Sequence, residues 1–176
     1  MRTHQTLLGF LLLLAGTLLT AQPLAASPAP SGWLTRPDFW VATAANVAGI
    51  GLFVARVHAP AIAPVMGAAT ELIGIPALIV GVVDLATRSA DATTAGMFCY
   101  AAWAVGAAFV DHVLKLDYRH PAKPAVLVPY VVAYYAAIGL ASATQLVNGL
   151  PPWLIAGSTC LLAVAASFYA RAKGAD

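Results

Sequence analysis

The sequence predicts an all-α, polytopic transmembrane helix bundle with five spans after an N-terminal signal peptide, or six spans if that peptide stays uncleaved. Hydrophobic residues make up 61% of the chain and charged residues 9%, with a mean hydropathy of +0.82. Soluble domains are typically about 45–50% apolar and about 25% charged. Several apolar runs approach the roughly 20 residues that cross about 30 Å of hydrocarbon. Because strand-like alternation is absent, helices rather than a barrel are expected to satisfy the backbone in lipid.

The first 26 residues are typical of a secretory signal peptide. Arg2 precedes an apolar core at 7–19, and small residues follow it. Cleavage after Ala26 places Leu24 at position −3, which leaves an uncleaved first helix as the alternative. Residues 27–37 then form an extracytoplasmic linker rich in Pro and Ala.

A single five-helix transmembrane domain is predicted over 38–173, with a cytoplasmic tail at 174–176. The connections between the apolar runs are short and contain Pro, Gly or charged residues, which favours a compact bundle of alternating direction. The expected spans are 39–57, 62–86, 93–116, 125–147 and 152–171.

The distribution of Lys and Arg predicts the orientation of the bundle. Cytoplasmic loops of membrane proteins carry an excess of these residues. With the mature N-terminus outside and the C-terminus in the cytoplasm, the outer side holds only Arg36 and Arg88. We therefore expect this orientation, in the inner (plasma) membrane of a bacterial-type cell. The cytoplasmic side then holds Arg56, Lys115, Arg119, Lys123, Arg171 and Lys173.

Composition and cysteine spacing exclude several classes of function. The formal net charge of +2 comes without a basic tract, so nucleic acid is not an expected partner. Cys99 and Cys160 both lie inside apolar runs and form no CxxC pattern. A disulfide between them is sterically conceivable, but a role as small apolar filler is preferred. No cofactor is predicted.

Glu71 is the most informative single residue, because it lies inside the second span. An acidic residue deep in a membrane helix costs roughly 2.5–3.5 kcal/mol on insertion scales. It is therefore expected to face the bundle, either paired or protonated. Pro76 cannot donate to the carbonyl of Leu72 and predicts a kink beside Glu71. The alternative is a structural hydrogen bond at a packing kink.

Charged residues gather at the cytoplasmic end of the third span. Seven of the 20 ionisable residues fall in positions 111–123. Asp111 and His112 lie within that span, and short connections bring them within reach of Glu71. Asp111 also precedes Lys115 by four residues, the favourable order for an ion pair on a helix. Glu71, Asp111, His112 and Lys115 thus form a predicted intramembrane polar cluster, with a plain Asp111–Lys115 pair as the alternative.

Two further polar residues lie deep in predicted spans. Asn46 in the first span and Tyr134 in the fourth are secondary candidates, each expected to need an interhelical hydrogen-bond partner. Stripes of small residues are expected to pack between helices. These stripes are Ala45 with Gly49, Ala102 with Gly106, and Ala133 with Ala137 and Ala141.

Neither a metal site nor a catalytic residue is predicted. Glu71, Asp111 and His112 are acceptable metal ligands, but HxxxH and HExxH patterns are absent. Patterns of known small membrane enzymes and carriers, such as GxSxG, are absent as well.

The preferred hypothesis is a small-solute or proton-linked transporter that uses the polar cluster near the cytoplasmic side. The first alternative is a non-catalytic accessory or scaffold subunit of a membrane complex. The second is a lipid-modifying membrane enzyme with Asp111, His112 and Arg119 near the headgroups. Lipid is the expected partner in each case, and a homo-oligomer or a membrane-protein partner is left open.

Overall fold

The computed structural model describes residues 32–87, 89–116 and 123–175. The predicted signal peptide, residues 27–31 of the predicted linker, Arg88 and Arg119 lie outside these described residues. Within them, every regular element is a helix or a helical turn, and there is no strand.

Among residues 32–87, 89–116 and 123–175, five helical segments are long and apolar enough to cross a membrane. They contain 22 to 27 residues each, or at least about 33 Å at a rise of about 1.5 Å per residue. Their bounds differ from the expected ones by three residues or fewer. The prediction of an all-α bundle with five spans is therefore confirmed. The segments are Pro37–His58, Pro60–Ala86, Ala92–Val113, Pro124–Asn148 and Leu150–Ala172.

Three of these spans are composite. The second comprises η2 (Pro60–Ile62), α3 (Ala63–Leu72) and α4 (Gly74–Ala86). In the third span a helix is followed by a wider turn, and in the fourth a helix is followed by a tighter turn. The first and last spans are each a single helix, and a short turn, η1 (Trp33–Thr35), precedes the first. The remaining elements are α2 (Pro37–His58), α5 (Ala92–Ala108), η3 (Phe109–Val113), α6 (Pro124–Ala143), η4 (Thr144–Asn148) and α7 (Leu150–Ala172).

Local sequence signals explain where these helices begin. Pro37 and Pro124 occupy the first position of α2 and α6, where a missing N–H costs nothing. Asp91 caps α5: its Oδ1 accepts from the Thr93 N–H at 2.7 Å, and the Asp91 N–H donates to the Thr94 hydroxyl at 3.2 Å. This reciprocal capping box fixes the start of α5.

The second span is interrupted at Ile73, between α3 and α4. Pro76 has no N–H for the carbonyl of Leu72, and its ring crowds that carbonyl, so α3 ends at Leu72. The Ile73 N–H still donates to the Ala69 carbonyl at 3.3 Å, and the Ala77 N–H donates to the Ile73 carbonyl at 3.1 Å. The kink that was expected beside Glu71 thus lies at Ile73, two residues after it.

The third span ends in a π-helical turn rather than in continuous α-helix. In η3 the Leu114 N–H donates to the Phe109 carbonyl, five residues back, at 2.8 Å. Such turns insert one residue and are frequent at functional sites. Asp111 and His112 lie inside this turn.

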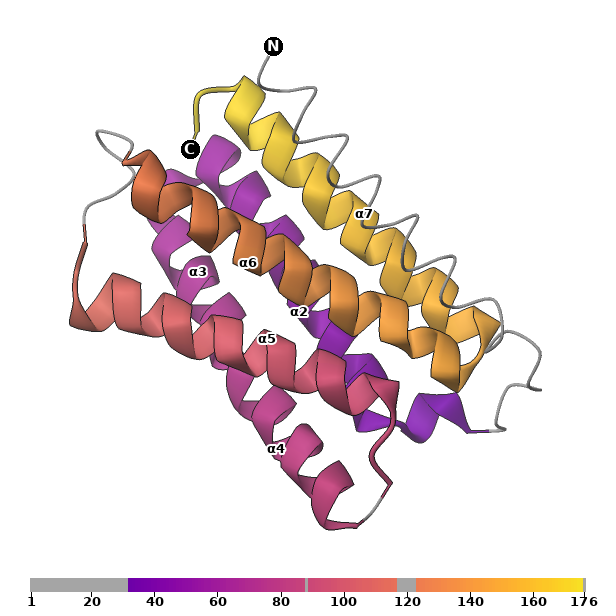
Figure 1. The fold of residues 1–176 in the computed structure, drawn as a ribbon. Coiled ribbons are helices and arrows are strands. Elements are labelled where there is room, and N and C mark those ends of the chain that lie inside the picture. Colours follow the sequence, from indigo (N-terminus) through magenta and orange to yellow (C-terminus); the bar gives the residue numbers. More distant parts are fainter. Residues whose placement is uncertain (1–31, 88, 117–122, 176) are drawn as a thin grey trace.

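The helices pack so that α6 lies between α5 and α7, with α2 behind them (Figure 1). The second span folds against α2 through α3 and against α5 through α4. The core consists mainly of alanine: in the part of the chain that the structure describes, 12 of the 20 buried hydrophobic residues are Ala. Small side chains let the helix backbones approach closely, which is how helices associate in lipid.

The expected small-residue stripes are only partly buried. Ala45 and Gly49 are buried, and so are Ala137 and Ala141. Ala133, Ala102 and Gly106 are exposed, so the packing expectation is wrong for them. Large apolar side chains cover the outer face, and Val65, Leu72, Val105 and Val132 are examples. That outer face is suited to contact with lipid.

Candidate functional site

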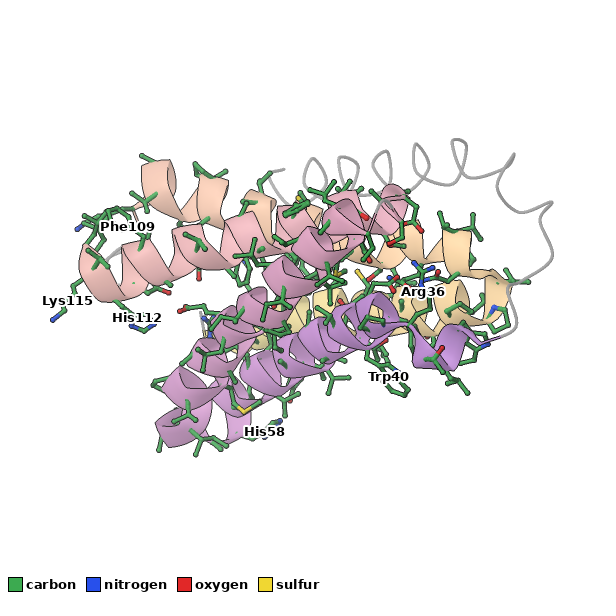
Figure 2. All side chains as sticks on the ribbon, turned by 90° about the horizontal axis from the view of Figure 1, so that it is seen from below. Arg36, Trp40, His58, Phe109, His112 and Lys115 are labelled. Carbon is green, nitrogen blue, oxygen red and sulfur yellow. The ribbon has the colours of Figure 1, made fainter. Side chains whose placement is uncertain are left out.

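Polar side chains gather at the two ends of the bundle. His58, His112 and Lys115 lie toward one end and Arg36 lies toward the other (Figure 2). At the His112 end, Glu71, Asp111, His112 and Tyr130 form what we call the carboxylate–histidine cluster. At the other end, Arg36, Asp38, Asp91, Gln145 and Asn148 form what we call the Asp38 network.

Glu71 and His112 are brought together from two different spans. Nε2 of His112 lies 2.8 Å from Oε2 of Glu71. The Glu71 side chain is 9% exposed, whereas the His112 side chain is 61% exposed. A shielded carboxylate is therefore in direct contact with an imidazole that reaches the surface.

Asp111 and Tyr130 extend this contact toward α6. The Tyr130 hydroxyl donates to Oδ2 of Asp111 at 3.3 Å. Asp111 also interacts with Glu71. The structure thus places Glu71, Asp111 and His112 together.

Lys115 does not keep the position that a continuous helix would give it. It follows the π-helical turn and has a φ of +48°, in the left-handed region. The regular spacing of four residues from Asp111 on one helix face is lost, because α-helical geometry stops at Ala108. The helical Asp111–Lys115 geometry expected from the sequence is therefore wrong.

A groove of about 300 Å³ runs beside Glu71 and His112, between the second span and α5. Eight of its ten lining residues carry no polar side chain, among them Leu72, Ile75 and Val105. These three side chains are also exposed on the outer face of the bundle. The groove is therefore mainly apolar and opens toward the region expected to hold lipid. Among the described residues that line it, Glu71 and His112 carry the polar side chains.

The Asp38 network was not found from the sequence. Asp38 is 1% exposed, and its Oδ1 accepts from Nε of Arg36 at 3.0 Å. Its Oδ2 accepts from Nδ2 of Asn148 at 2.7 Å and from Nε2 of Gln145 at 3.4 Å. One sequence signal could have pointed to Asp38: it is an acid directly after Arg-Pro, in the first turn of a helix. The N-terminal end of a helix favours negative charge.

Arg36 links this network to the start of α5. Its Nη2 lies 3.2 Å from Oδ2 of Asp91. Burial alone would raise the pKa of the Asp91 carboxyl, but hydrogen bonds from Thr93 and from Arg36 outweigh burial and lower that pKa. For Arg36, burial acts to lower the pKa, and its contacts with Asp38 and Asp91 outweigh it and raise the pKa. Both groups are therefore held in their charged forms.

Asn46 and Tyr134 lie in the interior between the two ends. Nδ2 of Asn46 donates to the Ser142 hydroxyl and the Ala156 carbonyl at 3.0 Å, and to the Thr159 hydroxyl at 3.1 Å. Asn46 is therefore an interhelical hydrogen-bonding residue, as predicted. The Tyr134 hydroxyl has no partner among the described residues, so the partner expected for it is missing there. It lies against Gly49, where any side chain would collide with it.

The structure gives no support for a metal or a disulfide in its described part. No group of three or more His, Cys, Asp or Glu side chains positioned to hold a metal ion occurs among residues 32–87, 89–116 and 123–175. Cys99 and Cys160, which both lie in those ranges, are free thiols.

The five apolar helices define the chain as a multi-pass α-helical membrane protein. Comparison with protein-family profiles, curated proteins and solved structures finds no match to this chain. Any finer function therefore has to be argued from the site itself.

Proposed function

We propose that this multi-pass membrane protein is a proton-linked transporter of a small solute, with Glu71 and His112 as its proton-carrying pair. The observation that carries the proposal is their 2.8 Å contact beside an apolar groove. Ionisable residues within membrane helices are costly and commonly mark proton or substrate pathways.

The difference in exposure between the two side chains gives each a distinct role. His112, 61% exposed, exchanges protons with water, and Glu71, 9% exposed, receives them in a shielded site. A histidine changes its charge near neutral pH more readily than any other unperturbed side chain. The pair can therefore hold one proton or release it without breaking the hydrogen-bond contact.

The backbone around both residues is irregular, which supports movement at this site. Glu71 lies two residues before the break at Ile73, and His112 lies inside the π-helical turn η3. Transporters that alternate their access need elements with two arrangements. A change in the charge of the pair would act directly on these two irregular segments.

Buried polar groups in the interior support a proton path across the bundle. Between the carboxylate–histidine cluster and the Asp38 network lie Tyr134 and Asn46. The Tyr134 hydroxyl and Oδ1 of Asn46 both lack a partner among the described residues. Groups with spare hydrogen-bonding capacity are what a proton relay through a helical bundle requires.

The proposed orientation places the carboxylate–histidine cluster on the cytoplasmic side of a cell inner membrane. Basic residues favour the cytoplasmic side. Arg56 and Arg171 lie in the last turns of α2 and α7, and His58 contacts Tyr169 at 3.3 Å, so these two ends are adjacent. Lys115 lies toward the same side of the bundle as His58 and His112 (Figure 2).

The test is electrical recording from proteoliposomes on a solid-supported membrane. Amino acids, sugars, carboxylates and organic cations are applied in turn, with an imposed pH gradient. We expect one solute class to give a transient current that depends on the gradient in the wild type and is lost in Glu71→Gln. Asp84→Asn is the matched control, because Asp84 is an acid on the same span outside the groove.

Two results would overturn the proposal. One is the absence of current for every solute class, which would favour the accessory-subunit alternative. The other is a current that Glu71→Gln leaves unchanged while the protein remains folded by size-exclusion chromatography. In that second case transport would not pass through Glu71.

A further inference from the structure

We infer that the groove between the second span and α5 binds an uncharged amphiphile, a hydrocarbon body with one hydroxyl group, that reaches it from the bilayer. This inference rests on the proposed transport function and names its substrate class. Four features support it: the place of the groove along the spans, its opening on the outer face, its apolar lining, and the hydrogen-bonding capacity of Glu71 and His112.

The groove runs from the middle of the membrane spans toward one end of the bundle. On the second span its lining extends from Ala68 to Leu78, with eight residues of the span before this stretch and eight after it. At about 1.5 Å per residue, each flank is about 12 Å long. On the third span the lining extends from Ala104 to His112, one residue before the end of that span. The groove therefore connects the region expected to hold hydrocarbon with the end that carries His112.

The outer face provides the route to the groove. Leu72, Ile75 and Val105 line the groove and are also exposed on the outer surface of the helices. A ligand that enters sideways between the second span and α5 must cross hydrocarbon. An isolated charge is costly there. The route therefore favours a ligand without charge.

The volume and the lining describe the body of the ligand. The groove measures about 300 Å³, at the lower end of the range of about 300–1,000 Å³ for small-molecule pockets. Ala68, Ala104, Val105 and Ala108 contribute no polar side-chain atom. This is room for one compact hydrocarbon body. A plain hydrocarbon chain would gain little by leaving lipid for this lining, since lipid tails are equally apolar.

A hydroxyl group supplies the gain that a plain chain lacks. In hydrocarbon a hydroxyl group has no hydrogen-bond partner, which is unfavourable. Glu71 and His112 lie 2.8 Å apart beside the groove and offer such partners. Because a hydroxyl group both donates and accepts, it can bond to a carboxyl or an imidazole group in either protonation state. A hydroxyl-bearing amphiphile is thus recognised without a defined charge at the site.

Acidic and basic side chains lie together around this pair. Asp111 contacts Glu71, and Tyr130 donates to Asp111 at 3.3 Å. Lys115 is exposed and follows the π-helical turn that contains Asp111 and His112. Partners of both signs are therefore within the same end of the bundle. Recognition of the ligand depends on hydrogen bonding and on the apolar fit, not on the net charge of this cluster.

The experiment is photolabelling of the purified full chain in phosphatidylcholine nanodiscs by octanol that carries a diazirine on its chain. Octylammonium and octanoate with the same diazirine are the matched control ligands, compared at equal concentration in the bilayer. Mass spectrometry identifies the labelled residues. We expect saturable labelling within 68–78 and 104–112 by the alcohol, removed by excess unlabelled octanol. The two ions should give only labelling that does not saturate.

Two substitutions that fill the groove locate the site. Ala68→Phe and Ala108→Phe narrow it from its two opposite walls and should each remove saturable labelling. Ala102→Phe, on the exposed face of α5 outside the groove, is the matched control and should be labelled as the wild type is. The use of two walls keeps the test decisive if one of these variants fails to fold.

Two substitutions at Glu71 separate hydrogen bonding from charge. Glu71→Leu removes the hydrogen-bonding group and should raise the half-saturating concentration about tenfold, which corresponds to about 1.4 kcal/mol. Glu71→Gln removes the charge but keeps a donor and an acceptor, so it should restore most of the affinity that Glu71→Leu loses. The same Glu71→Gln variant is expected to lose the transport current, so binding and transport are read out separately.

Three results would overturn the inference. They are saturable labelling by either ion at an equal or lower concentration than by the alcohol, saturable labelling unchanged in both Phe variants, and equal losses in Glu71→Gln and Glu71→Leu. Because labelling at equilibrium needs no transport, the two proposals fail differently. Currents with another solute class and no saturable labelling would refute only this inference. Saturable labelling without any current, with octanol included among the solutes, would refute only transport.

Discussion

Asp38 and Asn148 are 110 residues apart in the sequence, and Oδ2 of the acid accepts a hydrogen bond from Nδ2 of the amide at 2.7 Å. This contact joins the start of α2 to the end of η4, directly before α7 begins. Together with Arg36 and Gln145, it closes the end of the bundle opposite His112. Asp38, Gln145 and Asn148 are fully buried in this closure, whereas the Arg36 side chain is 35% exposed.

The first prediction concerns this closure. Asp38→Asn should lower the free energy of unfolding by about 2 kcal/mol, because the variant loses charge-assisted hydrogen bonds from buried donors. The free energy can be measured by SDS titration in mixed micelles. Asp84→Asn, at a partly exposed acid, should cost less than half as much. Equal losses of unfolding free energy in the two variants would contradict this prediction, because the buried network would then contribute no more to stability than the partly exposed Asp84 does.

The second prediction separates stability from function at Glu71. Glu71→Gln should change the free energy of unfolding by less than about 1 kcal/mol, since single interhelical hydrogen bonds in membranes average about 0.6 kcal/mol. Gln retains a side-chain donor and acceptor for His112. A loss of several kcal/mol, measured by the same titration, would instead make Glu71 a structural residue.

The third prediction tests the close approach of Gly49 and Tyr134. Gly49→Ala should cost about 1–3 kcal/mol, because the new methyl group collides with the Tyr134 hydroxyl. Tyr134→Phe should leave stability unchanged or raise it by about 1 kcal/mol, since it removes a buried hydroxyl without a partner among the described residues.

The double variant supplies the control for this pair. Gly49→Ala combined with Tyr134→Phe should cost less than Gly49→Ala alone. Gly157→Ala, at a helical glycine with open space around it, should not destabilise the protein. If the two substitutions at 49 and 134 were simply additive, the proposed collision would be ruled out.

The fourth prediction is a pH dependence at the Asp38 network. The folded-state pKa of Asp91 is lowered, so its contribution to stability is present above the unfolded pKa of about 3.9. That contribution is lost as the pH falls through the folded-state pKa. Asp91→Asn keeps a side chain that can cap α5 but removes the charge. When thermal unfolding is measured between about pH 3 and 7, the unfolding temperature should therefore fall less on acidification in the variant than in the wild type.

The fifth prediction concerns orientation. Green fluorescent protein fused to the C-terminus should fluoresce in a bacterial host, and alkaline phosphatase at the same place should be inactive. The physical reason is the excess of Lys and Arg at the ends of α2 and α7. An active phosphatase fusion would reverse the orientation and put the carboxylate–histidine cluster on the outer side.

The sequence was sufficient to predict the spans because lipid imposes a strong constraint on composition and length. It also allowed Glu71, Asp111 and His112 to be expected together. Glu71 lies on the second span, and Asp111 and His112 lie on the third. Successive spans joined by a short connection are expected to pack side by side, so this juxtaposition was an expectation from the order of the spans in the chain.

Other features of the site depend on packing and could not be predicted in this way. The amide partners of Asp38, Gln145 and Asn148, lie more than 100 residues away in the sequence, and the packing of α2 against α6 and α7 brings them together. The π-helical turn at 109–113 shifts the register by one residue, which displaced Lys115 from its expected position. The groove arises from the space between the second span and α5, and neither of them determines it alone.

The alanine-rich core also determines how mutational data on this protein should be interpreted. Replacement of residues by alanine cannot test the 12 buried positions that are already alanine. Such a scan would therefore record a tolerant interior, although these positions set the distance between the helices. Replacement by leucine at Ala77, Ala137, Ala156 or Ala163, each with 0% exposure, would force the helices apart. The informative mutational experiment here is enlargement rather than truncation.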